Sequence, residues 1–501
     1  MEMSIALPPA GSTTAPMYEQ IADQIANQIK SQVLAAGTKL PPERQLAERC
    51  GVSRTTAINA YRRLEEMGLV RTRVGSGTYV AEGAGEATAQ PMPWHQLLVP
   101  AWQSPVSGII RDLVAMDMPA DSVSMATGMP DPKLYPWAVF QAFLAEGSLA
   151  MTDLGHIATE GYGPLREALA ARHTAAGLAA AAENISVMAG SQQGLYLLAK
   201  VFLNPGDYVV VESPTYIGAL QIFQAAGARL LTLPASGPLQ LDLLEDYLIR
   251  YRPKLLYALP TFQNPSGRVM PAAERQALLA VAARHRLAVI EDDPYGDLYY
   301  DQAPPPPLKA LDKHGGVIYL RTFSKSVFPG LRVGWVVAPE PVVNRLSLEK
   351  QYVDLHANNL AQWLLYRFLS SGRFDEHLAR VRHEYRLRRD AAAQALRRYA
   401  GARLGYEVPS GGFYFWCRLT GNRVTTRSLL TEAGRLGVSV VPGDAFYAGQ
   451  EGEKEFRLCF TTNDAAMLQE GVKRLVRAID LAEKSGGPGG RRPLEPLPPI
   501  I

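Results

Sequence analysis

The residue with the clearest chemical potential is a lysine. Lys325 closes the run Thr322-Phe323-Ser324-Lys325, which directly follows an apolar segment typical of a buried strand. A lysine amine at the carboxyl end of a strand suits an imine with an aldehyde cofactor. Thr322, Ser324 and Arg332, seven residues after the lysine, carry hydroxyl and guanidinium groups that suit a phosphate. Taken alone, Lys325 is more simply explained as a surface lysine.

A second feature is the run Glu291-Asp292-Asp293, which ends another apolar segment. A buried carboxylate is unfavourable unless it is paired. A pyridinium nitrogen is a suitable partner for Asp292, because the pairing keeps the ring protonated as an electron sink. Tyr295 and Asn264 could each bond a ring oxygen. In isolation, an Asp at a strand end and a turn at Gln263–Gly267 explain these residues equally well.

A third feature is the run Gly190-Ser191-Gln192-Gln193, between a predicted strand and a predicted helix. Backbone N–H groups and the helix dipole at such a junction favour a bound phosphate. Tyr216 could stack on a cofactor ring, and the alternative is a core aromatic.

These residues follow the ends of successive strands, so the strands must position them. Helical segments separate the strands, a βαβ pattern that predicts an α/β body with a largely parallel sheet. From about Asp375 a long charged helix, 379–399, leads to a smaller α+β part. The predicted strands of the sheet are Ile185–Ala189, Tyr208–Val211, Leu255–Leu259, Leu287–Ile290, Val317–Leu320 and Arg332–Val337.

The charge of the 501-residue chain is concentrated near its start. Residues 16–81 hold nine Lys and Arg against six Asp and Glu, which accounts for the whole net charge of +3. The rest of the chain is neutral, with 42 residues of each sign. A short basic head on a large neutral body points to a head that contacts nucleic acid.

The head has the order of elements of a winged helix-turn-helix. A helix with Ile21, Ile25, Ile29 and Val33 on one face precedes a short helix, 43–50. A turn at Gly51 and an N-cap at Ser53 then start a third helix, followed by two strands with a Gly-rich tip. The third helix suits a major groove, and the candidate DNA-contacting residues are Arg44, Ser53, Arg54, Thr55, Thr56, Arg71 and Arg73. A small helical unit with solvated basic residues is the alternative.

Cysteine usage and hydropathy exclude several remaining classes of protein. Cys50, Cys417 and Cys459 are too few and too scattered for a disulfide framework or a metal site, so we expect a cytoplasmic protein. No apolar run is long enough for a membrane span. We expect four parts, a head at 16–81, a linker at 82–120, a body at 121–480 and a disordered tail at 481–501.

The head also resembles a known family. The run LPPERQLAERCGVSRTTAINAYRRLEEMGLVRTRVGSGTYV is similar to the DNA-binding domain of GntR regulators, over nearly all of residues 16–81. The resemblance implies that double-stranded promoter DNA is a partner. It also implies that Arg44, Arg54, Thr56 and Gly77 match DNA-contacting positions.

The body, over roughly residues 121–480, resembles the fold-type I aminotransferases that use pyridoxal 5′-phosphate. The resemblance implies that Lys325 forms an internal aldimine, that Asp292 pairs the ring nitrogen, and that Arg457 grips a substrate carboxylate. One departure is His156, which stands where the family often has a tyrosine that reaches the partner subunit's phosphate. The remaining implied cofactor contacts are Asn264 and Tyr295 to the ring oxygen and Ser191, Gln192, Thr322, Ser324 and Arg332 to the phosphate.

A GntR-type head on an aminotransferase-like body resembles the MocR subfamily of bacterial regulators. This resemblance implies a homodimer that senses an amino-acid-like effector through aldimine exchange at Lys325. Two alternatives stay open. One is an active aminotransferase, converting amino acid to 2-oxo acid, with an accessory DNA-binding head. The other, an architectural DNA binder with a decayed body, fits poorly because the cofactor residues are all present.

Overall fold

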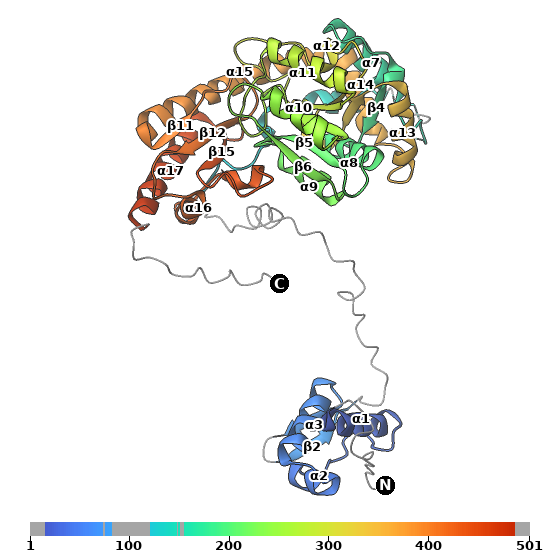
Figure 1. Ribbon diagram of the computed structural model, residues 1–501. Helices are drawn as coiled ribbons and strands as arrows, with labels where there is room; N and C mark the ends of the chain where they lie inside the picture. The colour runs from blue at the N-terminus through green and yellow to red at the C-terminus, as the bar shows by residue number, and fades with distance from the viewer. Residues whose placement is uncertain (1–15, 74–75, 83–120, 148, 151–154, 486–501) are drawn as a thin grey trace. The chain divides into compact units, whose positions relative to one another are not determined.

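The computed structural model describes residues 16–73, 76–82, 121–147, 149–150 and 155–485 (Figure 1). The chain divides into two compact units, Met1–Ala101 and Trp102–Ile501. All but the first residue of the predicted linker, 82–120, lies outside the described residues. Within the described residues, no helix has the combined length and apolarity that crossing a bilayer requires.

The head is a three-helix unit with a two-stranded wing. Its core is formed by apolar side chains from all three helices, among them Ile25, Leu46 and Leu64. The apolar periodicity predicts that Val33 lies in that core, but Val33 is 42 % exposed, because the first helix ends at Lys30. The elements are α1 (Met17–Lys30), α2 (Glu43–Cys50), α3 (Arg54–Glu66), β1 (Val70–Arg73) and β2 (Gly77–Val80).

The turn between α2 and α3 sets the angle of the two helices. Gly51 ends α2 with a φ of +66°, a left-handed conformation that glycine adopts without steric cost. The Ser53 side chain then accepts a hydrogen bond from the Thr56 N–H (3.1 Å) and caps α3. The wing strands are antiparallel, with Val70 opposite Val80.

The body is built on a seven-stranded sheet with the order β4-β10-β9-β8-β7-β5-β6. Neighbouring strands are parallel except for β10, which is antiparallel to both β4 and β9. The edge strand β6 is absent from the predicted strands, because most of its side chains are only half-buried. The strands are β4 (Ile185–Met188), β5 (Tyr208–Ser213), β6 (Arg229–Pro234), β7 (Leu255–Ala258), β8 (Ala288–Asp292), β9 (Val317–Thr322) and β10 (Gly334–Val337).

Helices cover both faces of this sheet (Figure 1). Side chains of β5 alternate between the faces, with Val209 and Val211 packed with α8 and α9, and Val210 packed with α10 and α11. The helices around the sheet are α6 (Trp137–Ala145), α7 (Gly163–Ala175), α8 (Ser191–Phe202), α9 (Ile217–Ala225), α10 (Leu241–Arg250), α11 (Ala272–His285), α12 (Leu308–Leu311), α13 (Glu340–Gln351) and α14 (Asn359–Ser370).

A smaller α+β part completes the body. Its sheet has the order β11-β12-β15-β14, and a separate short strand, β3 (Val123–Ser124), pairs in parallel with β13 (Val438–Ser439). The last helix continues to Ser485, so residues 481–485 are helical rather than part of a disordered tail. The other elements are α15 (Arg373–Ala395), β11 (Leu404–Tyr406), β12 (Tyr414–Leu419), α16 (Thr426–Arg435), β14 (Val441–Pro442), β15 (Glu455–Cys459) and α17 (Ala465–Ser485).

Candidate functional sites of the body and the head

Lys325 lies three residues beyond the end of β9, at the carboxyl edge of the large sheet. Its Nζ donates a hydrogen bond to the Gly128 carbonyl oxygen (2.7 Å). Burial, and then the nearby Arg457 guanidinium, lower the pKa of Lys325 to about 8. About a tenth of Lys325 is therefore the neutral amine at pH 7, which is the form that attacks an aldehyde.

Asp292 is the last residue of β8, and it is 4 % exposed. Its Oδ2 accepts a hydrogen bond from the Tyr257 hydroxyl (2.7 Å) on the neighbouring strand β7. Burial raises the pKa of Asp292 to about 7. Its Oδ1 is buried and has no hydrogen-bond partner among the described residues. A protonated ring nitrogen would supply the partner that Oδ1 lacks, so this residue fits the group that the sequence predicts.

The N-terminus of α8 forms a narrow cradle beside Arg332. Gly190 precedes the helix with a φ of +91°, and a Cβ there would lie 2.5 Å from Arg332 Nη2. That nitrogen donates to the Ala189 carbonyl oxygen (3.2 Å). The N–H of Ser191, the first residue of the helix, has no acceptor within the helix and follows directly after this Gly190 turn, an arrangement that suits a phosphate.

Hydroxyl groups after β9 face the same edge. Thr322 Oγ1 donates to Ser324 Oγ (3.0 Å) and accepts from the Ser324 N–H (3.1 Å). On α8, Gln192 Oε1 accepts a hydrogen bond from the Tyr216 hydroxyl (2.9 Å), which fixes the half-buried tyrosine beside the cradle.

The two candidate ligands of the ring oxygen have polar partners already. The Tyr295 and Tyr414 hydroxyls lie 2.9 Å apart, and both side chains are buried. Asn264 Oδ1 accepts from Arg457 Nη1 (2.9 Å), which joins the candidate cofactor residues to the candidate carboxylate ligand.

Arg457 lies on β15 and is 8 % exposed. Its guanidinium lies over the rings of Tyr414 (4.1 Å) and Phe446 (4.9 Å), and its Nη2 donates to the Ala126 carbonyl oxygen (3.1 Å). Its Nε is buried without a partner among the described residues. A guanidinium held rigidly with a spare donor is a suitable receptor for a carboxylate.

Several residues of this site were missed in the sequence. Tyr257 supports Asp292, and Tyr414 lies under Arg457 and beside Tyr295. A single tyrosine in the otherwise aliphatic run of β7 was the available signal for Tyr257. His156 lies apart from these groups in the described contacts. It is exposed, and its Nδ1 lies 3.2 Å from Nε2 of His356.

In the head, most of the predicted DNA-contacting side chains of the helices are exposed. Arg54, at the start of α3, pairs with Glu43 (3.4 Å), and its side chain is 71 % exposed. Arg44 pairs with Glu48 (3.3 Å) and is 84 % exposed. Thr55 is exposed and Thr56 half-buried, with its hydroxyl 2.8 Å from that of Ser53. Such exposed ion pairs are weak and can exchange their carboxylates for phosphates.

The wing carries a second group of exposed cations. Arg71 and Arg73 are exposed on β1, and Gly77 starts β2 with a φ of +118°. Lys39 Nζ and the Arg73 guanidinium lie over the Tyr79 ring, at 5.7 and 5.4 Å. Lys39 was not among the predicted DNA contacts, because only the backbone bridge between Lys39 and Tyr79 brings it to the wing.

The sequence matches two family models. One describes bacterial regulatory proteins of the gntR family and matches residues 17–80. The other describes class I and II aminotransferases and matches residues 142–475. Over 468 residues the chain is 33 % identical to YisV, an uncharacterized HTH-type transcriptional regulator of Bacillus subtilis (strain 168), with 93 % of this chain and 96 % of that protein covered.

Two solved structures are similar to the body. One is the kynurenine aminotransferase of Pyrococcus horikoshii in complex with PMP, with a TM-score of 0.72 and 34 % identity over 78 % of this chain and 98 % of that one. The other is the alpha-aminoadipate aminotransferase of Thermus thermophilus, complexed with N-(5'-phosphopyridoxyl)-L-leucine. It has a TM-score of 0.70 and 36 % identity over 78 % of this chain and 99 % of that one. The predicted fold class of head and body is thereby confirmed.

Proposed function

Because the chain belongs to the MocR-type GntR regulators, with a body of the class I and II aminotransferase family whose cofactor is pyridoxal phosphate, we propose that it regulates transcription in response to an amino-acid-like effector. The GntR-type head binds promoter DNA, and the body receives the effector at Lys325 and Arg457. Bound pyridoxal phosphate supplies an aldehyde that condenses with a primary amine. The effector's amine competes with Lys325 for that aldehyde, and its carboxylate binds Arg457.

The geometry of the site supports the following cofactor contacts as part of this proposal. Asp292 Oδ1 pairs the protonated ring nitrogen, which keeps the ring charged. Asn264 and Tyr295 bind the ring oxygen, and Tyr216 contacts the ring. The phosphate ligands in this proposal are Ser191, Gln192, Thr322, Ser324 and Arg332.

One observation carries the regulatory proposal. The two groups that meet the effector both donate hydrogen bonds to the same short segment, Lys325 to the Gly128 carbonyl and Arg457 to the Ala126 carbonyl. This segment lies a few residues after Asp121, where the described part of the body begins and the predicted linker ends. The chain that connects the two units therefore starts only a few residues from the effector site.

The same segment is also tied to the smaller part of the body. Met125 pairs through its N–H with the Ser439 carbonyl (2.9 Å) and through its carbonyl with the Cys459 N–H (2.8 Å). Asn463 Nδ2 donates to the Ser124 carbonyl (2.7 Å). An effector whose amine displaces Lys325 from the aldehyde would free that lysine to bond the Gly128 carbonyl, while the effector's carboxylate would compete with the Ala126 carbonyl for Arg457. Such differential contacts can bias two arrangements of the body and thereby change the affinity of the head for DNA.

A homodimer is part of the proposal. Tyr352, Val353 and Leu355 follow α13 and are 84 %, 53 % and 53 % exposed. A cluster of large apolar side chains in water favours burial against another surface. Two copies would present two heads, which suits an operator with two half-sites.

The test is a visible-absorbance titration of the holoprotein with single amino acids, followed by promoter binding with and without the amino acid that changes the spectrum. The proposal expects a change in operator affinity of about 5- to 150-fold, the range of common coupling free energies. An unchanged operator affinity at saturating amino acid would refute the sensor role.

A second candidate is an active aminotransferase. Lys325, with its pKa lowered to about 8, is suited to take a proton from the substrate Cα and to return it, as a general base and acid. Turnover assays with pairs of amino acid and 2-oxo acid separate the two functions. Sustained turnover that is independent of DNA would favour the enzyme.

A further inference from the structure

Gln193 is the third residue of α8, and its side chain turns back onto the cradle. Its Oε1 accepts a hydrogen bond from the Ala189 N–H (2.7 Å). The carbonyl of the same residue, Ala189, accepts from Arg332 (3.2 Å). Both polar groups of the Ala189 backbone are therefore held by side chains, directly before the turn at Gly190.

The other end of the Gln193 amide reaches a distant part of the chain. Its Nε2 donates to Asp354 Oδ2 (2.8 Å), and Asp354 lies in the turn after α13. Asp354 Oδ1 in turn accepts from Lys350 Nζ (2.9 Å), whose side chain is 0 % exposed. A fully buried ammonium requires a carboxylate partner, and Asp354 supplies one to Lys350.

This ion pair determines the orientation of the Gln193 side-chain amide. An ionised carboxylate only accepts hydrogen bonds, so the NH₂ group of the amide must face Asp354. The amide oxygen is then directed at the Ala189 N–H. With Asp354 absent, the amide could reverse, and its NH₂ group would meet the Ala189 N–H as donor against donor.

We propose that Asp354 is a positioning residue of the phosphate site, which acts through Gln193 to hold the turn at the N-terminus of α8 ready for a phosphate. Asp354 does not itself bind the phosphate, since two anions repel each other. The inference rests on the proposed assignment of Ser191 and Arg332 to the phosphate. It extends that site to the turn after α13, which carries none of the proposed ligands.

The experiment compares pyridoxal phosphate with pyridoxal, which has the same ring and aldehyde and lacks the phosphate. Dissociation constants of both are measured by absorbance on the full-length protein, and their ratio reports the phosphate contribution alone. Gln193→Met removes both side-chain bonds at similar volume and leaves the Lys350–Asp354 pair intact. We expect the preference for pyridoxal phosphate to fall about tenfold, the effect of roughly one or two hydrogen bonds.

Asp354→Ala tests the remote residue and should lower the preference in the same direction. Gln351→Met is the matched control, because Gln351 is exposed and lies three residues before Asp354. It should leave the preference unchanged. Equal losses for both ligands in Gln193→Met, or an unaltered preference in Gln193→Met or Asp354→Ala, would overturn the inference. Failure of the wild-type protein to prefer pyridoxal phosphate would instead refute the phosphate assignment itself.

Discussion

Asp292 is a buried carboxyl group whose expected partner, the cofactor ring nitrogen, is absent from the apoprotein. Its carboxyl group is buried, one of its oxygens has no partner among the described residues, and its pKa is raised from 3.8 to about 7. The folded apoprotein therefore holds a proton that the unfolded chain loses between about pH 4 and pH 7. Because the folded form binds more protons in this window, this group makes the apoprotein less stable as the pH rises through it.

Asp292→Asn should separate stability from binding. The amide keeps an acceptor for Tyr257 and removes the buried charge, so at pH 8 the apoprotein should gain about 1–3 kcal/mol of unfolding free energy. The affinity for pyridoxal phosphate should fall, since a neutral amide cannot pair a charged ring nitrogen. Denaturant unfolding with and without the cofactor measures both effects. An apoprotein destabilised at pH 8 would contradict the account of this residue.

The second prediction at this scale concerns Lys325. Attachment of pyridoxal phosphate to the apoprotein should accelerate as the pH rises through about 8, because the amine loses its proton there. Arg457 is the second cause of the lowered pKa of Lys325, after burial. Arg457→Met should therefore raise that pKa and move the midpoint of the rate profile to higher pH. Stopped-flow absorbance gives the profiles, and a midpoint that moves downward or stays in place would argue against the coupling.

At the scale of elements, the sequence predicts the strands better than their directions. The buried strands β7, β8 and β9 each begin with an apolar run, and their carboxyl ends place Asp292 and Lys325 at one edge. The antiparallel β10 and the half-buried edge strand β6 have no comparable signal, because pairing direction depends on tertiary contacts.

The hydrogen-bond partners within the site could not be predicted from the sequence, for a related reason. Gln193 and Asp354 are far apart in the sequence, and each is an ordinary polar residue on its own element. Their hydrogen bond exists only because α13 packs beside α8. Likewise, the apolar periodicity predicts a helix that reaches Val33, but the helix ends at Lys30, where the Ser31 backbone N–H caps it.

The cradle at α8 gives a prediction with a close control. Gly190→Ala places a Cβ 2.5 Å from Arg332 Nη2 at a φ of +91°, so the cradle must widen. Gly206 has a φ of +94°, and a Cβ added there would meet nothing within 4 Å. Both alanine variants should lose about 1–2 kcal/mol of stability from the left-handed backbone. Only Gly190→Ala should also weaken pyridoxal phosphate binding, and equal binding by the two variants would count against the cradle.

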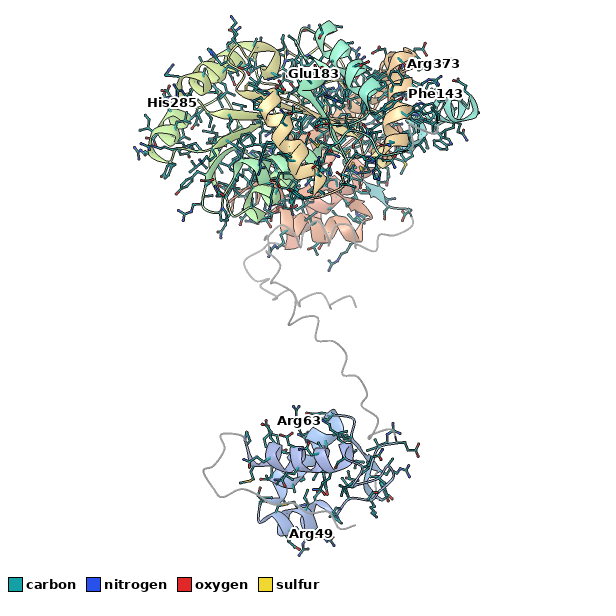
Figure 2. The ribbon with its side chains drawn as sticks, turned by 90° about the vertical axis from the view of Figure 1, so that its right-hand side faces the viewer. Arg49, Arg63, Phe143, Glu183, His285 and Arg373 are labelled. Carbon is teal, nitrogen blue, oxygen red and sulfur yellow. The ribbon has the colours of Figure 1, made fainter. Side chains whose placement is uncertain are left out.

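At the scale of the whole molecule, the basic head has its own prediction. Arg54→Ala should weaken operator binding by about 1–3 kcal/mol, and binding should weaken steeply with salt. Arg63 is a suitable control, because it lies about two and a half turns further along α3 and therefore faces the opposite side of the helix. Figure 2 shows Arg63 and Arg49 at opposite ends of the head. Competition binding at two salt concentrations would show the difference. A loss of operator affinity in Arg63→Ala as large as that in Arg54→Ala would refute the assignment of the α3 face that contacts the groove.

In the proposed mechanism, effector binding in the body controls the affinity of the head for DNA. The most direct measurement is operator affinity of the holoprotein with and without the responsive amino acid, in the wild type and in Lys325→Ala and Arg457→Met. We predict that the amino acid changes the affinity of the wild type and leaves that of both variants unaltered. An identical response in all three proteins, or none in the wild type despite a spectral change, would contradict the account.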